Sequence, residues 1–579
     1  MKTVLRQLGR YRRDTWLCIA MTTLEVIMEI LLPFITALII DEGLEAASLP
    51  TVYRYGALMV VMSFCSLAFG ALGGKFAASA SSGLAANLRE AVYNNIQTFS
   101  FSNIDKFSVP GLVTRMTTDI TNVQNAYMML IRVAVRSPLM LVFSYIMCLI
   151  ISPKLSLTFL LAVLFLAVVL GVIMVVTMRI FTEVFSKYDD LNASVQENVS
   201  AIRVVKAFVR EDYEDKKFAK ASQNLYRLFV KAEGLLAFNN PAMMLAVYFC
   251  IIMVSWLGAH FIVSGSMSAG ELTSLFSYVM SLMMSLMMLS MVVVMITMSM
   301  ASIRRISEVL NETPDLAEPE SPVYKVADGS IDFDHVDFSY KHGSGKNALS
   351  DIDLHIRSGE TIGVIGGTGS GKSSLVNLIC RLYDTDKGTV KVGGVDVRKY
   401  DMETLRNEVS VVLQKNTLFS GTILDNLRWG NPDATEEECK AACHAACADE
   451  FIDRFPDGYH TRIERGGANV SGGQKQRLCI ARALLKKPKV LILDDSTSAV
   501  DTATDAKIRA AFAREIPGTT KIIIAQRISS VENADRILVL DNGRINGFDT
   551  HENLLKTNAI YREIYESQVK GGGDFDQPA

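Results

Sequence analysis

The sequence predicts two unlike domains: an all-α membrane domain of six helices, followed by an α/β domain built around a phosphate-binding loop. Long apolar runs dominate the chain up to about Met300, whereas the remainder has the mixed composition of a soluble domain. That second part contains GGTGSGKS at Gly366–Ser373 and LILDDSTSAVD at Leu491–Asp501. From its length and composition we expect a membrane domain at residues 1–310, a second domain at 328–570 and a flexible tail at 571–579.

The composition of the whole chain narrows the class of protein. Of its 579 residues 50% are hydrophobic and 21% are charged, and the mean hydropathy is +0.25. A formal net charge of −3 is too small to indicate a nucleic-acid partner. The nine cysteines follow no framework spacing, so we expect no disulfides. The first apolar run is too long for a signal-peptide core, so we expect it to remain in the mature protein.

The membrane domain is predicted from runs that approach the roughly 20 apolar residues needed to span a bilayer. The third run is shorter, and its helix is expected to begin upstream, near Tyr127, and to project out of the membrane. The six predicted spans are about 16–40, 55–74, 137–152, 155–178, 241–263 and 273–300.

Basic residues set the predicted orientation, because cytoplasmic loops carry an excess of Lys and Arg. Lys and Arg cluster before the first span, between spans two and three, and between spans four and five, while the other loops contain almost none. The N-terminus, both long loops and the C-terminal domain are therefore expected in the cytoplasm.

Both long loops are predicted to be helical extensions of the spans. Residues Leu191–Glu211 carry an apolar stripe at helical spacing. Residues Ser102–Asp119 indicate a helix end, a turn at Pro110–Gly111 and a new helix. We expect each loop to turn back towards the membrane and to present a short helix to a cytoplasmic partner.

Two features inside the spans are candidate substrate contacts. Glu25 and Glu29 share one face of the first span, where carboxylates are costly and usually face a cavity or a partner. They either attract cationic or polar substrates or form a structural pair with neighbouring helices. A methionine stripe on the sixth span suits a promiscuous binding surface, although plain helix packing gives the same pattern. Its members are Met280, Met284, Met287, Met291, Met295 and Met298, of which Met284 and Met291 are the candidate substrate contacts.

The segment GGTGSGKS matches the phosphate-loop pattern G-x-x-x-x-G-K-[ST]. It follows the apolar strand TIGVI and precedes the helix-compatible run SLVNLICRLY, which is the context that the pattern requires. The glycines turn backbone N–H groups towards phosphates, Lys372 reaches the β- and γ-phosphates, and the Ser373 hydroxyl coordinates magnesium.

Two further segments complete a nucleotide site. Leu491–Leu493 are predicted to form a buried strand, after which Asp494 holds the magnesium ion. Upstream, the segment VSGGQ at Val470–Gln474 opens a helical run whose start provides a second anion-binding terminus. The motif SGGQ alone is weak evidence, but its position between the phosphate loop and the aspartate strand is highly specific.

On these residues the chain resembles the ATP-binding cassette (ABC) transporters, and the similarity extends over nearly its whole length. The resemblance implies a six-helix exporter domain fused ahead of one nucleotide-binding domain. In that family two such halves pair, and each ATP lies between the phosphate loop of one half and the SGGQ signature of the other. It therefore implies ATP and Mg²⁺ as cofactors, a second ABC half-transporter as partner, and a place in the lipid bilayer.

Individual residues of this sequence match the site residues of the family. Tyr340 in DFSY matches the aromatic residue that stacks on adenine, and Gln414 in VVLQKN matches the glutamine that touches magnesium and the attacking water. Asp501 closes the SAVD turn that contacts the other half. The turns near Val109–Gly111 and Val209–Glu211 are similar to the coupling helices that dock on the nucleotide-binding domains. The phosphate loop and the signature comprise Gly366, Gly367, Thr368, Gly369, Ser370, Gly371, Lys372, Ser373 and Ser374, and Ser471, Gly472, Gly473 and Gln474.

Two positions depart from the family pattern. Asp495 stands where the family usually has glutamate, and Gln526 stands where it usually has histidine. The aspartate carboxylate lies about 1 Å or more short of the place that a glutamate reaches, and such a misplacement can cost on the order of 10²-fold in rate. Glutamine, unlike imidazole, does not titrate. Together these changes predict a site that binds ATP but hydrolyses it slowly.

A slow site with an intact signature predicts one half of an asymmetric heterodimer. The family includes bacterial multidrug exporters of this kind, which implies a multi-pass bacterial plasma-membrane protein that exports hydrophobic or amphipathic compounds. The alternatives are a lipid or peptide exporter half, or an ATP-binding regulatory subunit that gates a partner.

One cysteine-rich helix is a further candidate site. Cys439, Cys443 and Cys447 lie four residues apart, with His444 beside them, so a metal site is conceivable. The surrounding segment has the composition of an ordinary alanine-rich helix after Thr435, and cysteines packed in the core are the simpler explanation.

Overall fold

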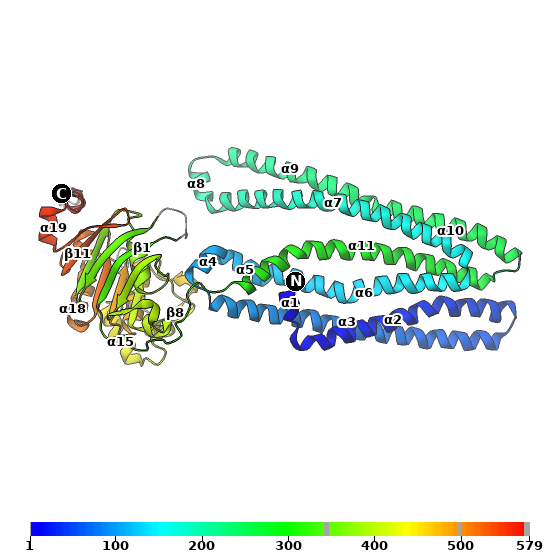
Figure 1. The fold of residues 1–579 in the computed structure, drawn as a ribbon, viewed down its shortest axis with the longest axis horizontal. Coiled ribbons are helices and arrows are strands. Elements are labelled where there is room, and N and C mark those ends of the chain that lie inside the picture. Colours follow the sequence, from blue (N-terminus) through cyan, green and yellow to red (C-terminus); the bar gives the residue numbers. More distant parts are fainter. Residues whose placement is uncertain (1, 341–346, 496–499, 572–579) are drawn as a thin grey trace. The chain divides into compact units, whose positions relative to one another are not determined.

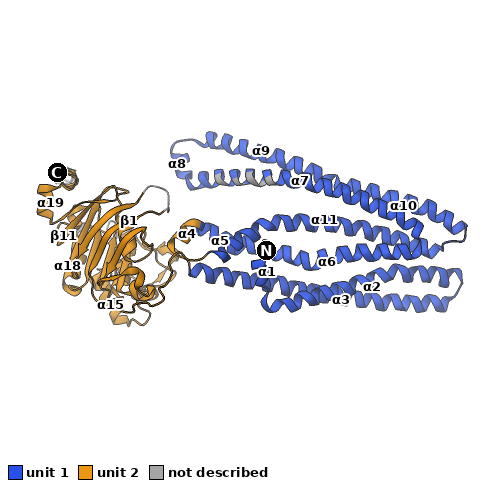
Figure 2. Ribbon diagram, in the orientation of Figure 1, with its two compact units in different colours: residues 1–98, 107–312 blue, residues 99–106, 313–579 orange. Residues whose placement is uncertain are grey.

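The computed structural model describes residues 2–340, 347–495 and 500–571. The chain divides into two compact units (Figure 2). Unit 1 comprises Met1–Thr98 and Phe107–Glu312, and unit 2 comprises Phe99–Lys106 and Thr313–Ala579. The predicted tail lies outside the described residues except for residue 571, which ends the last helix.

Unit 1 is an all-α bundle of long helices (Figure 1). Within the described residues, six helical segments are long and apolar enough to cross a membrane, as predicted. The helices are α1 (Lys2–Arg6), α2 (Arg12–Leu38), α3 (Leu49–Gln97), α5 (Val109–Thr114), α6 (Ile120–Ile151), α7 (Pro153–Ser200), α8 (Ile202–Ala207), α9 (Glu211–Ala237), α10 (Asn239–Val263) and α11 (Ala269–Asn311), with the 3-10 turn η1 (Gly9–Tyr11) and the π-helical segments η2 (Ile39–Glu45) and η3 (Arg115–Asp119).

The third span begins further upstream than expected. Helix α6 starts at Ile120 and follows α5 and η3 without a break, so the apolar segment has a helical extension that begins before Tyr127. The extension packs along α11, the helix from which the chain leaves unit 1.

The first long loop differs from the prediction in its details. Helix α4 (Phe101–Phe107) ends just before Ser108, which has a positive φ of 57° and accepts a hydrogen bond from the Gly111 N–H. The predicted turn at Pro110–Gly111 is therefore wrong, because Pro110 lies in the first turn of α5. Proline is accommodated there because the first turn of a helix does not need its N–H.

The short helix of this loop is α4, upstream of the predicted coupling turn. Most of α4 belongs to unit 2, where the Tyr383 hydroxyl donates a hydrogen bond to Asp105 at 2.9 Å and the ring of Phe101 lies 6.2 Å from that of Tyr383. In the second long loop, α7 ends at Ser200, α8 follows, and Val209 turns the chain into α9 with a φ of 51°. This value is rare for a β-branched residue and marks a sharp turn.

Unit 2 contains three sheets. Their strand orders are β2-β1-β4-β5, β12-β11-β3-β10-β9-β6 and β7-β8 among the described residues. In the second of these, β11, β3, β10, β9 and β6 run parallel, and β12 is antiparallel to β11. The strands are β1 (Ile331–Phe338), β2 (Leu349–Ile356), β3 (Thr361–Gly366), β4 (Lys387–Val392), β5 (Val395–Asp396), β6 (Val409–Val412), β7 (Gly421–Thr422), β8 (Arg462–Ile463), β9 (Val490–Asp494), β10 (Thr520–Ile524), β11 (Arg536–Asp541) and β12 (Arg544–Asp549).

The parallel sheet separates two apolar cores, because alternate residues of its buried strands point to opposite faces. In β9, Leu491 and Leu493 join one core, while Val490 and Ile492 join the other. The helices of unit 2 are α12 (Lys372–Ile379), α13 (Met402–Glu408), α14 (Ile423–Leu427), α15 (Glu436–Ala445), α16 (Asp449–Ile452), α17 (Gly472–Leu484), α18 (Thr502–Glu515), α19 (His551–Thr557) and α20 (Ala559–Gly571), with 3-10 turns at Val397–Lys399, Gly458–His460, Arg465–Gly467 and Ile528–Ser530.

The close approach of α2 to the start of α11 generates a test of the bundle. A Cβ on Gly270 would lie 2.4 Å from the Ala37 carbonyl oxygen and 2.6 Å from Asp41 Oδ1. We expect Gly270→Ala to lower the free energy of unfolding by about 1–3 kcal/mol, because backbone must move to accept the methyl group. Fluorescence-detected thermal unfolding in detergent measures this. The control is Gly171→Ala in α7, where a Cβ has nothing within 4 Å; equal melting temperatures for the two variants would contradict this packing.

Candidate nucleotide site

The predicted nucleotide-site residues gather where the parallel strands end. The sheet order β3-β10-β9-β6 makes neighbours of strands that are distant in sequence. The phosphate loop leaves β3 at Gly366, Asp494 ends β9, Gln526 follows β10, and Gln414 follows β6. The carboxyl edge of such a sheet is where ligands of α/β proteins bind.

The phosphate loop has the shape of an anion cradle. Gly369 and Gly371 have φ values of 80° and 99°, which glycine adopts without strain. A Cβ on Gly371 would lie 2.7 Å from the Leu349 side chain, whereas Gly367 and Gly369 face open space. The loop is thus packed on one side and open on the side that a phosphate would occupy.

The Lys372 side chain points back into the phosphate loop. Its ammonium group donates to the carbonyl oxygens of Gly366 and Gly367, both at 2.8 Å. An ammonium group has three N–H donors, so one remains for a phosphate oxygen. Burial lowers the pKa of Lys372, and the nearby carboxylates of Asp494 and Asp495 oppose that shift.

Hard oxygen ligands of the kind that Mg²⁺ prefers lie beside the loop. Asp494 is buried and accepts a hydrogen bond from the Ser373 side chain. Burial raises the pKa of Asp494, and the neighbouring carboxylate of Asp495 adds to the effect. A divalent cation would favour the charged carboxylate. Ser373, Asp494 and the amide carbonyl of Gln414 therefore form a chemically suitable set for Mg²⁺.

The two unusual positions, Asp495 and Gln526, contact each other. Gln526 Nε2 donates to Asp495 Oδ2 at 2.8 Å, and Gln414 Nε2 lies 3.4 Å from the same oxygen. Asp495 itself has a φ of 48°, and its N–H donates to the Ile524 carbonyl at 3.0 Å. The carboxylate is thus held by amide groups that do not titrate.

Gln568 is a site residue that the sequence analysis missed. From α20, its Nε2 donates to the Gln526 carbonyl and its Oε1 accepts from the Ile528 N–H, both at 2.8 Å. This amide fixes the backbone on both sides of Arg527. A single glutamine in a polar C-terminal helix carries no sequence pattern that would have identified it.

Tyr340 is positioned by two aromatic neighbours. Its ring packs edge-on against Phe338 at 4.8 Å and against Tyr383 at 5.1 Å between centroids. Its hydroxyl lies 3.0 Å from Ser374 Oγ, at the end of the phosphate loop. About half of the Tyr340 side chain stays exposed, which leaves ring surface for stacking.

The signature begins a helix, as predicted. Ser471 caps α17: its Oγ accepts from the Gln474 N–H at 3.3 Å, and Gln474 Oε1 accepts from the Ser471 N–H at 2.9 Å. Gly472 and Gly473 form the first turn, where the helix dipole attracts anions. Within the described chain, no hydrogen bond joins the signature to the phosphate loop.

Asp501 also caps a helix. Its Oδ1 accepts from the Thr504 N–H at the start of α18 at 2.9 Å, and this backbone hydrogen bond lowers the pKa of Asp501. The two residues that begin the predicted SAVD turn lie outside the described residues.

The two carboxylates of the first predicted span share one basic partner. Arg136 on α6 forms ion pairs with Glu25 and, at 2.6 Å, with Glu29. Glu25 is buried, and a Cβ on Gly70 would lie only 3.1 Å from its Oε1. The partner assumed by the structural alternative is therefore present; the substrate role of the two glutamates stays a prediction.

The two predicted substrate methionines have different surroundings. Met291 lines a cavity of about 560 Å³ between α7, α9, α10 and α11, whereas Met284 is 62% exposed and lies outside that lining. The other five methionines of the lining are Met174, Met178, Met243, Met287 and Met288.

The cysteine-rich helix packs into a core. Cys439 and Cys443 on α15, and Cys447 just after it, are buried in the larger apolar cluster of unit 2. His444 lies on the exposed side, with Nδ1 2.7 Å from Asp449. The cysteines thus occupy the places that the packing explanation predicts.

Comparisons with known proteins cover both units. The family described as the ABC transporter transmembrane region matches residues 15–309, and the family described as ABC transporter matches residues 349–498. The chain belongs to the ABC transporter family. It is 35% identical over 568 residues to the uncharacterized ABC transporter ATP-binding protein YfiB of Bacillus subtilis, and 36% identical over 575 residues to an uncharacterized ABC transporter ATP-binding protein of Mycobacterium tuberculosis; each comparison covers 98% of both chains.

A solved structure defines the architecture of this ABC transporter chain more closely. The structure of a bacterial Atm1-family ABC exporter with ATP bound matches it with a TM-score of 0.83 at 26% identity, over 96% of this chain and 99% of that one. The chain is thus an ABC exporter half-transporter, a multi-pass membrane protein whose ATP-binding domain drives transport.

The surroundings of Tyr340 generate a prediction for ATP binding. Tyr340→Ala should weaken ATP binding about ten-fold, because stacking on a base contributes about 1–3 kcal/mol. Tyr340→Phe removes only the hydroxyl near Ser374 and keeps the ring, so it should bind like the wild type. Titration of the full chain with a fluorescent ATP analogue measures both. Equal losses in the two variants would assign the effect to the hydroxyl instead.

Proposed function

We propose that this chain is the slow-hydrolysing half of a heterodimeric exporter of hydrophobic or amphipathic compounds. The contact between Asp495 and Gln526 carries the proposal. A general base must reach the attacking water, and catalysis is sensitive to displacements of about 1 Å. The Asp495 side chain is one methylene shorter than the glutamate that the family usually has. Its carboxylate accepts a hydrogen bond from the Gln526 amide, at a position where the family usually has an imidazole.

The rest of the site supports ATP binding. The phosphate loop, the Ser373–Asp494 pair and the ring of Tyr340 suit the phosphates, Mg²⁺ and adenine, respectively. When bound, Mg²⁺ would neutralise phosphate charge. The capped signature on α17 has the form needed to complete the site of a partner half that has glutamate and histidine at these positions.

The cavity beside α11 supports the proposed substrate class. Its volume of about 560 Å³ is in the usual range for drug-sized ligands. Methionine side chains adapt to varied apolar shapes. Thr177 Oγ1 and Asn239 Oδ1 are buried in this lining without a hydrogen-bond partner. Such groups favour a ligand that has an apolar body and a hydrogen-bond donor, as an amphipathic amine has.

Orientation and partner belong to the same proposal. The basic clusters favour a cytoplasmic N-terminus and a cytoplasmic nucleotide-binding domain in a bacterial plasma membrane. The partner is a second, catalytically competent ABC half-transporter.

Hydrolysis by the full chain in lipid nanodiscs tests the slow site. The unmodified chain should turn over ATP slowly, whereas the double variant Asp495→Glu, Gln526→His should be faster by about 10²-fold, because the carboxylate gains reach and the switch group can titrate. Light scattering confirms that both samples are dimers.

Adding Lys372→Ala to the double variant controls for contaminating ATPases and should remove the gain. Rapid hydrolysis by the unmodified chain that disappears in Asp495→Ala would show that Asp495 is a competent base and would refute the proposal.

Transport of a probe tests the substrate class. Inside-out vesicles containing the chain and its partner should take up ethidium, a fluorescent amphipathic cation, when ATP is supplied. Met291→Trp fills the cavity and should reduce uptake about ten-fold or more. Met284→Trp adds the same bulk outside the lining and should keep most of the uptake. Absence of ATP-dependent uptake in the unmodified complex would favour a regulatory subunit or a lipid or peptide cargo.

A further inference from the structure

The chain passes between its two units at three points. These points follow Thr98, Lys106 and Glu312 (Figure 2). The first two flank the segment of α4 that belongs to unit 2, and the third follows α11. Within this chain, the covalent path by which a movement of unit 2 can enter unit 1 therefore runs through the last turn of α3, through α5 and η3, and through the last turns of α11.

Polar side chains tie these entry points together inside unit 1. We call this set the exit clamp. On α3, η3 and α6 it comprises Asn95, Arg115, Asp119 and Asn122, and on α11 it comprises Ser299, Ser302, Arg305 and Glu308. The four α11 residues recur at every third position, so each is a neighbour of the next on the helix surface.

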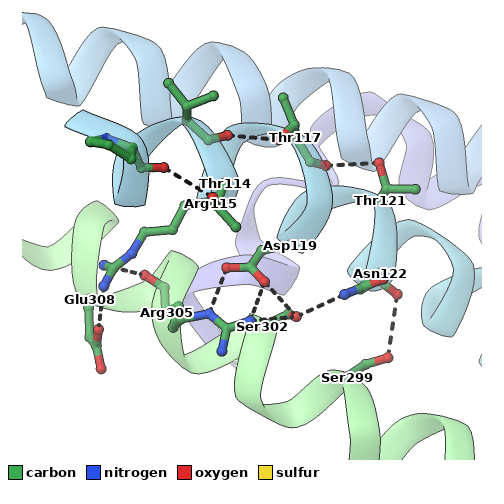
Figure 3. Close-up of polar contacts among 12 residues, drawn as sticks. Thr114, Arg115, Thr117, Asp119, Thr121, Asn122, Ser299, Ser302, Arg305 and Glu308 are labelled. Carbon is green, nitrogen blue, oxygen red and sulfur yellow. Dashed lines mark hydrogen bonds and ion pairs between the residues drawn. The ribbon is translucent and has the colours of Figure 1, made fainter. Parts of the chain in front are cut away.

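Asp119 is the centre of the exit clamp (Figure 3). It is only 1% exposed, and Arg305 pairs with both of its oxygens, with Nε 2.7 Å from Oδ2. Ser302 Oγ adds a hydrogen bond to Oδ1 at 2.8 Å. Asp119 ends the π-helical segment η3, and such wide turns occur mostly as single turns, often at functional sites.

The remaining contacts reach the other entry points. Asn95 at the end of α3 donates to the carbonyl oxygens of Val309 at 2.7 Å and Glu312 at 3.1 Å, where α11 ends. Arg115 donates to the Arg305 carbonyl at 3.0 Å and pairs with Glu308 at 3.2 Å (Figure 3). The Val309 carbonyl also accepts from the Glu312 N–H, so Asn95 adds a second hydrogen bond at the point where α11 ends. Each segment through which the chain leaves unit 1 is thus bound to the last turns of α11.

We propose that Asp119 and Arg305 are positioning residues that make α3, α6 and α11 move as one body when unit 2 binds ATP. The proposal rests on ATP-driven transport by this exporter chain and is independent of its cargo and of the rate of its own ATP site. An ion pair with a buried carboxylate suits this role: the Arg305 side chain is 44% exposed, but removing it would leave the buried Asp119 charge uncompensated. The pair therefore resists any sliding of η3 along α11.

Hydrogen exchange of the full chain in lipid nanodiscs tests this coupling. A non-hydrolysable ATP analogue with Mg²⁺ should change amide exchange in unit 2 and also at the ends of α3, α6 and α11 that form the exit clamp. The double variant Asp119→Asn, Arg305→Gln removes both charges, so neither is left buried alone. It should keep the response of unit 2, while the response of unit 1 falls at least about five-fold, the lower end of typical coupling between sites.

Two further variants separate coupling from stability. Asn95→Ala removes only the donors to the end of α11, and it should reduce the same response even if the double variant fails to fold. Asp41→Asn is the matched control: Asp41 accepts from Ser268 Oγ at 2.6 Å and from the Gly270 N–H at 2.8 Å, at the opposite end of α11. It should lower thermal stability but keep the response to nucleotide.

A unit 1 response of wild-type size in the variants with an altered clamp would overturn the proposal. So would an equal loss in Asp41→Asn, since any weakened contact of α11 would then suffice. An unmodified chain whose unit 1 shows no response to the bound analogue would also overturn it.

Discussion

The register of the parallel strands places the phosphate loop and the polar residues that follow β9, β10 and β6 at one edge of the sheet. Ile524 pairs with both Val364 and Asp494, so β10 and β9 end at the same level, and β3 continues for two more residues to Gly366, where the phosphate loop begins. The hydrogen bond from the Asp495 N–H to the Ile524 carbonyl extends this alignment one residue further and fixes the left-handed turn of Asp495. A shift of one residue along a strand would turn its side chains to the other face. The catalytic geometry is therefore a property of the backbone, and the side chains add its chemistry.

Sequence patterns correctly predicted the features whose residues lie close together in the sequence. The phosphate loop was predictable because one turn between β3 and α12 contains all of its residues, and the spans because their length and apolarity reflect the bilayer itself. The meeting of Asp495 with Gln526 was implied by family resemblance alone. Their contact crosses 31 residues of sequence and depends on β10 lying beside β9, which no local pattern specifies.

Features that depend on distant partners were missed for the same reason. Arg136 belongs to the basic segment between spans two and three that was used to predict the orientation, and its pairing with Glu25 and Glu29, more than a hundred residues away in the sequence, was not predicted. Pro110 was interpreted as a turn, although the break falls at Ser108, where a non-glycine residue adopts a positive φ. Proline signals a helix start as well as a turn, and here Pro110 lies in the first turn of α5.

The hydrogen bond from the Gln568 side chain to the Gln526 carbonyl links the C-terminal helix α20 to the loop after β10. A truncation made before Gln568 for convenience, or a rigid fusion that pulls on α20, would remove or disturb the two hydrogen bonds that Gln568 makes to the loop after β10. Kinetic values from shortened or tagged chains would then describe an altered loop. Gln568 is bonded to Gln526, and Gln526 is bonded to Asp495. A regulator that binds α20 at Gln568 would therefore act two hydrogen bonds away from Asp495.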